Sequence, residues 1–547
     1  MKTLPIGIDN FKELIENNYY YIDKTRMIEH LLTNPKKVTL ITRPRRFGKT
    51  LNMSMIKYFF EIQSDNKELF KDTYIYKTKF MEQQGTFPVI DLTFKDCKGD
   101  SWQEVKEMLI ETITDELSRY EYLLKIDDIR TKDKLTFERL ITNQASDTEI
   151  VKSVLMLSRL LQDYYQTKCI ILLDEYDVPI ESARHGNFYN EAIGFISKLL
   201  SITFKQNEYM HLGLITGCLR IGKESIFTGW NNLKVETILN KTYARDFGIT
   251  MVEMGELLTY YNMKDNMDTV RAWYNGYNFG DIDIYNPWDL VNFIDDKLLD
   301  KNADPKSYWV NTSSNDIIHD LLKYSDSETK MELEELLKGG TITKSIDDSC
   351  SYKDYDLSSL WSILLFTGYL TGKQVEKDQY KLRIPNKSIR ECFVKQITRF
   401  NECKFKEHYA DVLQKALING DTITVEHSLN EYMNESLSQH DTKENGYHLF
   451  LSGVCSNLVD YKVVSNREAG RGRSDIILVP AHNQLLPGII FELKYASSES
   501  YLDSKAESAY KQIEEKEYQR YFGVYTERPI VKYGIAFCGK ICKVHGN

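Results

Sequence analysis

Residues 38–50 read VTLITRPRRFGKT, a short β-branched run followed by a basic loop that ends in Gly-Lys-Thr. Apolar residues then recur at helical spacing through residues 51–60. A strand, a loop of this kind and a helix form a phosphate-binding loop, whose general pattern is GxxxxGK followed by Ser or Thr. Arg43 stands where the pattern has its first glycine, so we expect the opening turn of the loop to differ from the usual one.

The loop residues have distinct predicted roles. Gly48 lets the backbone approach phosphate groups, and Lys49 reaches the β- and γ-phosphate oxygens. The Thr50 hydroxyl ligates Mg²⁺, and the helix N-terminus adds its dipole. The loop residues predicted to contact the nucleotide are Arg46, Phe47, Gly48, Lys49 and Thr50.

Residues 170–175, IILLDE, supply the second half of the predicted site. In phosphate-binding-loop enzymes the first carboxylate, here Asp174, holds the metal with its water shell, and the second, Glu175, orients or deprotonates the attacking water. Many strands end in acids that only cap a helix or face solvent. The combination with a Gly-Lys-Thr loop is much rarer, so the sequence predicts binding of ATP or GTP, ATP being preferred, with Mg²⁺.

The run HLGLIT, residues 211–216, predicts the next strand, which leads into Arg220. Thr216 at its tip is a candidate sensor of the γ-phosphate, and Arg220 a candidate source of positive charge for the transition state. Two plainer interpretations stay equally open: Thr216 caps a helix, and Arg220 forms a surface ion pair.

The chain is expected to fold as an α/β protein in three parts. Apolar strands at residues 38–42, 87–94, 169–173 and 211–216 alternate with helices, the pattern of a parallel sheet covered on both faces. Helical spacing predominates from residue 289 onward, and a mixed pattern returns near the C-terminus. The predicted domains are residues 1–288, residues 289–439, mostly helical, and residues 440–547.

A second group of charged residues lies in the last part. Residues 474–479 (SDIILV) and 488–494 (GIIFELK) predict two strands, and Glu492 and Lys494 share one strand face. A hairpin folded about Asn483–Gln484 would place Asp475 opposite Glu492. Two carboxylates suit Mg²⁺ or Mn²⁺, and such a site can activate water and stabilise a phosphodiester under attack. Charged residues on exposed strand ends are common, so the pattern alone is weak.

Neighbouring residues add to this group. Glu444 and His448 open a predicted helix, Arg471 and Arg473 precede Asp475, and Gln512 lies on a later helix. Each has a plainer interpretation, as a packed histidine, solvated loop charges or an exposed helix residue.

Composition narrows the class of protein. The 547 residues carry a net charge of −10, which excludes a generally basic nucleic-acid binder but not a local basic groove. We expect a cytoplasmic protein, because the start has no secretory signal and no apolar stretch is long enough to cross a membrane. The 9 cysteines are scattered without a CxxC pair, which favours reduced core thiols over zinc binding.

Several segments together resemble a known family. They are YIDKT (21–25), RPRRFGKT (43–50), LLDEYD (172–177), TGCLRIGKESIFTGWNN (216–232), WYNGYNFG (273–280), YNPWDL (285–290), SNREAGRGRSDI (465–476) and KYGIAFCGK (532–540). Nearly end to end, the chain resembles bacterial proteins with an AAA-ATPase-like N-terminal half, related to the archaeal-type ATPases of the STAND group, and a C-terminal PD-(D/E)XK nuclease-superfamily domain.

The resemblance implies a restriction-endonuclease-like C-terminal fold. It places Asp475, Glu492 and Lys494 at the nuclease-motif positions and Glu444 and His448 at the preceding helix motif. The resemblance also implies that an arginine at this position, here Arg43, is usual in the family. Ser474 replaces the superfamily's usual proline, a position that is often degenerate.

The preferred hypothesis is an ATP-controlled nuclease that acts on DNA rather than RNA, with possible homo-oligomers. Predicted catalytic residues are Glu175, Asp475, Glu492 and Lys494, and predicted metal ligands are Thr50, Asp174, Glu444, Asp475 and Glu492. The alternatives are an ATP-driven switch whose nuclease-like fold only binds nucleic acid or a partner, and an assembly protein that binds ATP but hardly hydrolyses it. The aromatic residues of segment 273–288 could stack on bases, although packing is favoured.

Overall fold

The fold is described from a computed structural model of the full chain. It describes residues 1–125, 129–186, 188–222, 226–309, 318, 326–349, 357–402, 407–436, 444–456, 458, 460–469, 472–481, 486–523 and 529–546. The chain forms two compact units, one of residues 1–313 and 343–389, the other of residues 314–342 and 390–547. The three-part division expected from the sequence stays a prediction, and its boundary at residues 439–440 lies outside the described residues.

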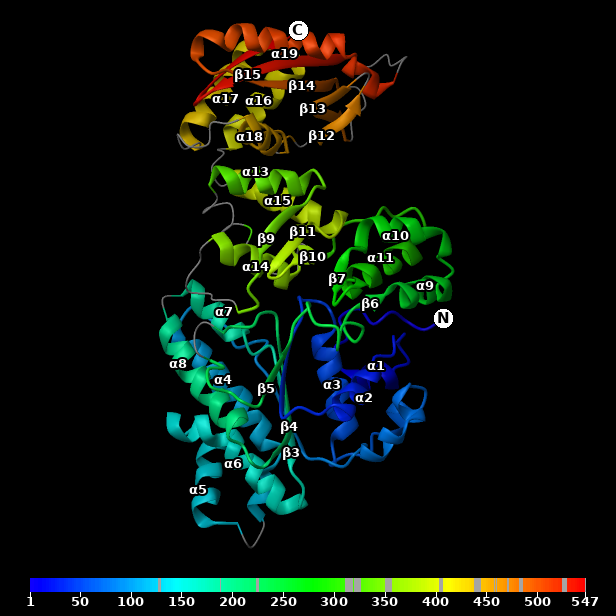
Figure 1. The fold of residues 1–547 in the computed structure, drawn as a ribbon, viewed down its shortest axis with the longest axis vertical. Helices are drawn as coiled ribbons and strands as arrows, with labels where there is room; N and C mark the ends of the chain where they lie inside the picture. The colour runs from blue at the N-terminus through cyan, green and yellow to red at the C-terminus, as the bar shows by residue number, and fades with distance from the viewer. Residues whose placement is uncertain are drawn as a thin grey trace. The chain divides into compact units, whose positions relative to one another are not determined.

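A parallel sheet of five strands organises the first unit. Its strand order is β2-β3-β4-β1-β5, and every neighbouring pair is parallel. All five residues of β1 and all six of β3 are buried, as strands covered on both faces require. Figure 1 shows α1, α2 and α3 on one side of this sheet and α4, α6 and α8 on the other. The strands are β1 (Val38–Thr42), β2 (Val89–Thr93), β3 (Cys169–Asp174), β4 (Met210–Gly217) and β5 (Leu233–Glu236).

The described part of this unit also contains two smaller sheets, with strand orders β6-β8-β7 and β10-β11-β9, although the first residue of β9 is assigned to the second unit. Their strands are β6 (Ile249–Thr250), β7 (Tyr277–Phe279), β8 (Ile282–Tyr285), β9 (Ile342–Ser345), β10 (Thr371–Glu376) and β11 (Gln379–Arg383). The helices of the unit are α1 (Phe11–Glu16), α2 (Arg26–Thr33), α3 (Lys49–Phe60), α4 (Trp102–Ser118), α5 (Thr131–Ile141), α6 (Asp147–Tyr165), α7 (Val178–His185), α8 (Tyr189–Leu200), α9 (Met251–Tyr260), α10 (Met267–Tyr274), α11 (Pro287–Leu299) and α14 (Leu357–Thr367).

The second unit is built on a mixed sheet of order β12-β13-β14-β15-β16, in which only β14 and β15 run parallel. The strands are β12 (Tyr461–Ala469), β13 (Gly472–Pro480), β14 (Gly488–Tyr495), β15 (Ile530–Cys538) and β16 (Ile541–Gly546). The helices are α13 (Ser327–Leu337), α15 (Lys387–Glu402, which begins in the first unit), α16 (Glu407–Asn419), α17 (Thr422–Ser436), α18 (Glu444–Ser456) and α19 (Leu502–Glu515).

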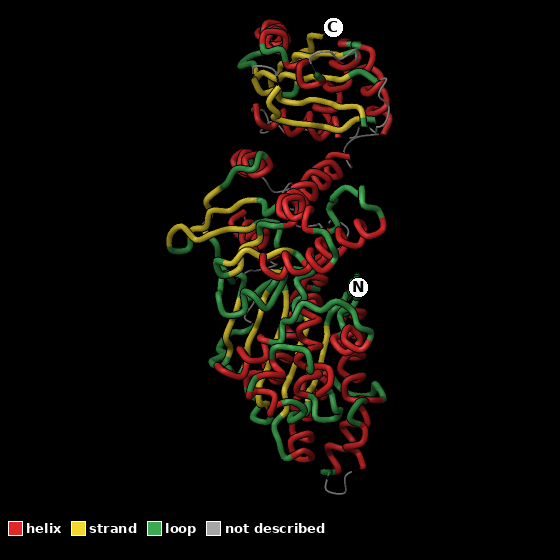
Figure 2. The backbone as a smooth tube through the Cα atoms, turned by 90° about the vertical axis from the view of Figure 1, so that its right-hand side faces the viewer, coloured by secondary structure: helices red, strands yellow, loops and turns green. Residues whose placement is uncertain are grey.

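Alternation along its strands gives this sheet two apolar faces. Ile476 and Leu478 pack with residues of α16, α17 and α18, whereas Ile477 packs with Ile513 of α19. Figure 2 shows strands of this sheet between helices. Ile490 of β14 packs toward α19. Glu492 lies two residues further along the same strand, and side chains two residues apart point to the same face, so its side chain also lies on the α19 face.

The α/β fold class expected from the sequence is confirmed, with a parallel N-terminal sheet, a helical middle region and a mixed C-terminal sheet. The predicted strand at residues 38–42 coincides with β1. The middle region also contains the short strands β9, β10 and β11, which the sequence pattern did not predict. These strands are largely exposed, so they lack the apolar run that marks a buried strand.

The close approach of α19 to β15 yields a stability prediction. A Cβ at Gly534 would lie 2.2 Å from the main-chain nitrogen of Tyr510 and 2.4 Å from the main-chain oxygen of Ala506. We expect Gly534→Ala to lower the free energy of unfolding by about 1–3 kcal/mol, the usual cost of overpacking. Thermal unfolding followed by calorimetry measures this loss.

The matched control is Gly194→Ala in α8, where an added Cβ would meet no atom of the described residues within 4 Å outside its chain neighbours and its own helix backbone. We expect this change to raise the free energy of unfolding by about 0.5–1 kcal/mol, because alanine favours a helix over glycine. A Gly534→Ala protein as stable as the wild type would contradict the described packing of α19.

Candidate functional site

The carboxylate of Asp174 lies at the centre of the first candidate site. It ends β3 and is 2% exposed. The Thr50 hydroxyl donates a hydrogen bond of 2.7 Å to its Oδ2, and the Thr216 hydroxyl donates to its Oδ1. Burial, and after it the charge of Glu175, raises the pKa of Asp174, while both hydroxyls act to lower it. Three predicted site residues, from α3, β3 and β4, therefore meet at one carboxylate.

The loop before α3 opens without a glycine, as expected. Arg43 keeps a negative φ, and the left-handed conformations fall at Arg46 (φ 68°) and Gly48 (φ 83°). The Arg43 side chain is fully buried, and its guanidinium donates to the main-chain oxygens of Thr42 (2.8 Å) and Glu236 (3.1 Å). Burial lowers its pKa to about 10. Arg43 therefore fastens the loop to β5 instead of providing a flexible turn.

The remaining loop side chains are held by packing and by main-chain oxygens. Lys49 Nζ donates to the main-chain oxygens of Arg43 (3.1 Å) and Pro44 (3.2 Å). Phe47 is buried against the rings of Tyr277 and Phe279.

The Arg46 guanidinium lies 4.2 Å from the ring centroid of Trp288, in a cation–π arrangement. Trp288, like Tyr277 and Phe279, belongs to the aromatic segment 273–288, so these three rings pack against the loop.

Two residues beside Asp174 differ in their surroundings. Glu175 has a left-handed φ of 53° and is half-buried, and within the described part of the chain no donor is hydrogen-bonded to its carboxylate. Such a backbone strain in a residue other than glycine is typical of functional positions. Asp177 is buried and accepts hydrogen bonds from the amides of Cys218 (2.7 Å) and Leu219 (2.9 Å).

Burial raises the pKa of Asp177 to about 6. Sequence reasoning gave this residue no role, although it lies in the LLDEYD segment. It fixes the loop that follows Thr216.

Arg220 lies at the end of that loop. Its guanidinium pairs with Asp348 at 2.8 Å, and both side chains are partly exposed. Of the two interpretations left open by the sequence, this geometry corresponds to an ion pair. Its predicted contact with the nucleotide stays a prediction.

An apolar pocket of about 110 Å³ adjoins the loop. Phe47, Gly48 and Leu51 form the side next to the loop and α3. Polar groups are few, as in most small-molecule sites. The other lining residues are Leu4, Pro5, Leu14, Tyr20, Tyr21, Ile22, Lys24, Asn52, Asp246, Gly248, Ile249, Leu257, Pro287 and Val291.

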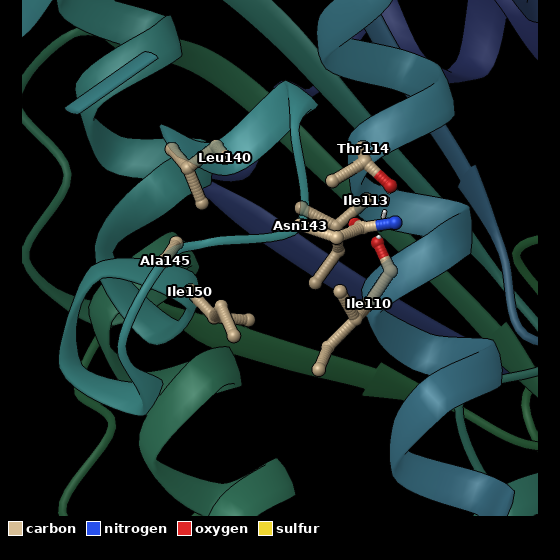
Figure 3. A pocket seen from close by; sticks show the side chains of 7 residues that line it. All are labelled: Ile110, Ile113, Thr114, Leu140, Asn143, Ala145 and Ile150. Atoms are coloured by element: carbon tan, nitrogen blue, oxygen red, sulfur yellow. Dashed lines mark hydrogen bonds between the residues drawn. The ribbon is translucent and has the colours of Figure 1, made fainter. Parts of the chain in front are cut away.

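A smaller pocket of about 40 Å³ lies among α4, α5 and the start of α6 (Figure 3). Ile110, Leu140 and Ile150 line it. The Thr114 hydroxyl, which also lines the pocket, donates a hydrogen bond of 2.8 Å to the main-chain oxygen of Ile110. It has room for a few water molecules but not for a nucleotide.

The second candidate site lies on β13 and β14. The two strands are antiparallel, with Ile476 paired to Phe491, so the same register places Asp475 opposite Glu492. The connecting turn predicted at Asn483–Gln484 lies outside the described residues. Asp475 Oδ2 accepts a hydrogen bond of 2.8 Å from the amide of Leu493. The pairing expected from the sequence is therefore present.

The two carboxylates repel each other in a buried setting. Glu492 is 5% exposed, and burial, followed by the charge of Asp475, raises its pKa to about 8. Burial also raises the pKa of Asp475. The hydrogen bond from the Leu493 amide and the charges of His448 and Lys338 act in the opposite direction and lower this pKa. Glu492 Oε2 is buried, and none of the described residues forms a hydrogen bond with it. These oxygen ligands fit a hard divalent cation such as Mg²⁺.

Gln512 of α19 joins the remaining members of this site. Its amide oxygen accepts from Lys494 Nζ at 2.8 Å, and its amide nitrogen donates to Glu492 Oε1. The half-buried Gln512 is therefore more than an exposed helix residue. It holds the ammonium and the carboxylate beside each other on one strand face.

His448 of α18 reaches the opposite side of β13. Its Nε2 donates to the main-chain oxygen of Asp475 at 3.1 Å, and its Nδ1 lies 3.6 Å from Glu334 Oε1. Glu444 begins the same helix, but its side chain is outside the described residues, as are Arg471 and the side chain of Arg473. Among the described residues, no three His, Cys, Asp or Glu side chains gather as a metal site.

In the described part of the chain, no helix has the length and apolar character needed to cross a membrane.

Comparisons with known proteins find matches for two regions of the chain. Residues 5–227 match a family model described as "Predicted AAA-ATPase", and residues 442–546 match one for the PD-(D/E)XK nuclease superfamily. The chain is also similar to the "Uncharacterized protein in vnfD 5'region" of Azotobacter chroococcum mcd 1, with 26% identity over 396 residues that cover 71% of this chain and 68% of the relative. This chain therefore combines a region that matches the AAA-ATPase-like family model with a region that matches the model of the PD-(D/E)XK nuclease superfamily.

Proposed function

We propose that the chain hydrolyses ATP and thereby controls a Mg²⁺-dependent nuclease that acts on nucleic acid, DNA rather than RNA. The observation that carries the proposal is the meeting of Thr50 and Thr216 on the buried Asp174. A hydroxyl at a helix start, a carboxylate at a strand end and a polar side chain on the next strand are the groups that bind Mg²⁺ and sense a γ-phosphate.

The geometry supports a specific pose for the nucleotide. The phosphates would meet the main-chain amides at Gly48 and the N-terminus of α3, where the helix dipole favours an anion. Lys49 would leave the main-chain oxygens of Arg43 and Pro44 for the phosphates. The apolar pocket beside Phe47 and Gly48 would take the base.

Bound Mg²⁺ would neutralise charge on the phosphate oxygens, held by Thr50 and by Asp174 directly or through water. The strained Glu175 projects a carboxylate that accepts no hydrogen bond within the described part of the chain. It is therefore suited to orient the attacking water and to accept its proton.

Cleavage would take place at Asp475, Glu492 and Lys494. A divalent cation bound by the two carboxylates would supply an activated water and stabilise charge on the phosphodiester. The ammonium of Lys494, held beside Glu492 through Gln512, would neutralise the developing charge.

An alternative is an ATP-driven switch or assembly protein whose nuclease-like fold binds nucleic acid or a partner without cutting it. Two observations favour it: the net charge of −10, and the finding that no three metal-binding side chains gather among the described residues. Nuclease assays separate the two hypotheses, because a binding scaffold does not need the Lys494 ammonium.

We expect two variants of the ATPase half to differ, one in ATP binding and the other in ATP hydrolysis. We expect Lys49→Ala to lose ATP binding, because the ammonium that meets the phosphates is gone. We expect Glu175→Gln to bind ATP normally but hydrolyse it about 100- to 10,000-fold more slowly, as when a general base is lost. Binding of a fluorescent ATP analogue and release of phosphate measure the two effects.

Glu191→Gln, an exposed glutamate of α8, is the matched control and should hydrolyse ATP at the wild-type rate. Unchanged hydrolysis in Glu175→Gln would remove the role assigned to this carboxylate.

The nuclease half predicts that cleavage depends on one lysine. End-labelled single- and double-stranded DNA and RNA are incubated with the full chain in Mg²⁺ or Mn²⁺, with and without ATP. We expect Lys494→Ala to cleave about 100- to 1,000-fold more slowly, the usual loss when a charge-stabilising group is removed. Lys511→Ala, an exposed lysine of α19 paired with Glu507, is the matched control.

If ATP controls the nuclease, Lys49→Ala should also remove the ATP dependence of cleavage. A wild-type chain that cuts none of these substrates would favour the switch hypothesis instead.

Metal binding at the second site should depend on pH. Because the pKa of Glu492 is raised to about 8, this group is protonated at neutral pH and must release its proton before it binds a cation. We expect Mn²⁺ affinity to rise about tenfold per pH unit from about pH 6 and to level off above about pH 8. Calorimetry in buffers of different ionisation heat measures both the affinity and the released proton. The same slope in Glu492→Gln would refute the assignment to this group.

A further inference from the structure

Helix α13 (Ser327–Leu337) belongs to the same unit as the candidate nuclease site, although residues 442–546 alone match the nuclease superfamily. It packs against α18, the helix that carries His448. Leu333 and Leu336 of α13 are buried, so one face of the helix is packed and not exposed to solvent. The functional unit therefore includes a segment far upstream of the matched region.

Glu334 is the residue by which α13 approaches the site. Its side chain is 4% exposed, and its Oε1 lies 3.6 Å from His448 Nδ1 and 3.0 Å from Lys338 Nζ. A buried carboxylate is costly unless charged or polar partners compensate it. The Lys338 ammonium is the cation that compensates Glu334, and the His448 ring lies beside the same carboxylate oxygen.

His448 connects this carboxylate to the strand that carries Asp475. A carbonyl oxygen can only accept a hydrogen bond, so His448 Nε2 is the donor to the main-chain oxygen of Asp475. Glu334 Oε1 lies 3.6 Å from the other ring nitrogen, Nδ1, which is longer than a hydrogen bond, so the carboxylate acts on His448 through its charge and its packing. The order of contacts is Lys338, Glu334, His448 and then the Asp475 main chain.

We propose that Glu334 is a positioning residue of the nuclease centre, which orients His448 and through it the β13 main chain that presents Asp475. This inference rests on the proposed nuclease function. It extends the working site beyond the matched region to α13. Outer partners of this kind hold metal-binding groups in place, and their loss typically costs about 10- to 100-fold in metal affinity or activity.

The test compares variants of the full chain on a DNA substrate that the wild type cleaves. We expect Glu334→Gln, which keeps the shape but removes the charge, to lower kcat about 10- to 100-fold and to raise the Mn²⁺ concentration for half-maximal cleavage, with KM for DNA unchanged. Glu335→Gln, an exposed neighbour on α13, is the matched control and should behave as the wild type.

A double variant separates positioning from a purely structural role. If Glu334 acts through His448, then Glu334→Gln should cause little further loss in a His448→Asn background. Thermal unfolding of each variant shows whether the protein remains folded, and Glu334→Asp, which restores the charge, should recover part of the activity.

Three outcomes contradict the inference, and they are distinguishable. Wild-type cleavage by Glu334→Gln, or losses that simply add in the double variant, would overturn the role of Glu334 and leave the nuclease intact. A wild-type chain that neither cleaves nor binds Mn²⁺ would overturn the proposed nuclease itself, and the role of Glu334 with it.

Discussion

The burial of the Asp174 carboxylate constrains the whole first site. A carboxylate removed from water is costly unless hydrogen-bond donors replace the lost solvent, and Thr50 and Thr216 are those donors. The two hydroxyls come from α3 and β4, so satisfying one charge fixes the start of a helix and the ends of two neighbouring strands. The parallel sheet makes this possible, because carboxyl ends of parallel strands lie along one edge.

In the second site, buried charges are stabilised by a neutral side chain. Asp475 and Glu492 face each other across two antiparallel strands, and their mutual repulsion adds to the effect of burial. Gln512 can donate to a carboxylate and accept from an ammonium, so one neutral side chain satisfies both Glu492 and Lys494. A bound divalent cation would relieve the remaining repulsion, which ties metal binding to the loss of protons.

Much of the fold was predictable because its strands are buried. The runs VTLIT and CIILL carry a continuous apolar signal, and these became β1 and β3. Strands β10 and β11 carry alternating charged residues with exposed side chains, so no such signal exists. The antiparallel pairing of β13 with β14 was predictable, since a single hairpin register places Asp475 opposite Glu492.

The contacts that the sequence did not predict join segments far apart in the chain. Trp288 lies over Arg46, and Glu334 lies beside His448, but neither pair belongs to a motif of fixed spacing. Asp177 is different, because it lies three positions after Asp174, and its burial against the amides of Cys218 and Leu219 only becomes visible once β4 is in place. Motif spacing reports on local geometry, whereas these contacts depend on tertiary packing.

The middle region serves both units. Residues 343–389 belong to the first unit, where Asp348 pairs with Arg220 and the Thr371 hydroxyl accepts from the amide of Asn278. Residues 314–342 belong to the second unit, where Glu334 meets His448. The chain therefore passes from one unit to the other within residues 326–349. Glu334 of this segment contacts His448, and Asp348 contacts Arg220.

This connectivity bears on how ATP could control cleavage. A coupling between two sites needs an element whose state both sites influence. Segment 326–349 is a candidate for such an element, because Glu334 and Asp348, which contact members of the two candidate sites, lie on one stretch of chain. Arg220 follows the strand that carries Thr216, so if Thr216 senses the γ-phosphate as proposed, a change there would reach Asp348 through the Arg220 ion pair. Control of the nuclease would then depend on this segment, and not only on nucleotide binding.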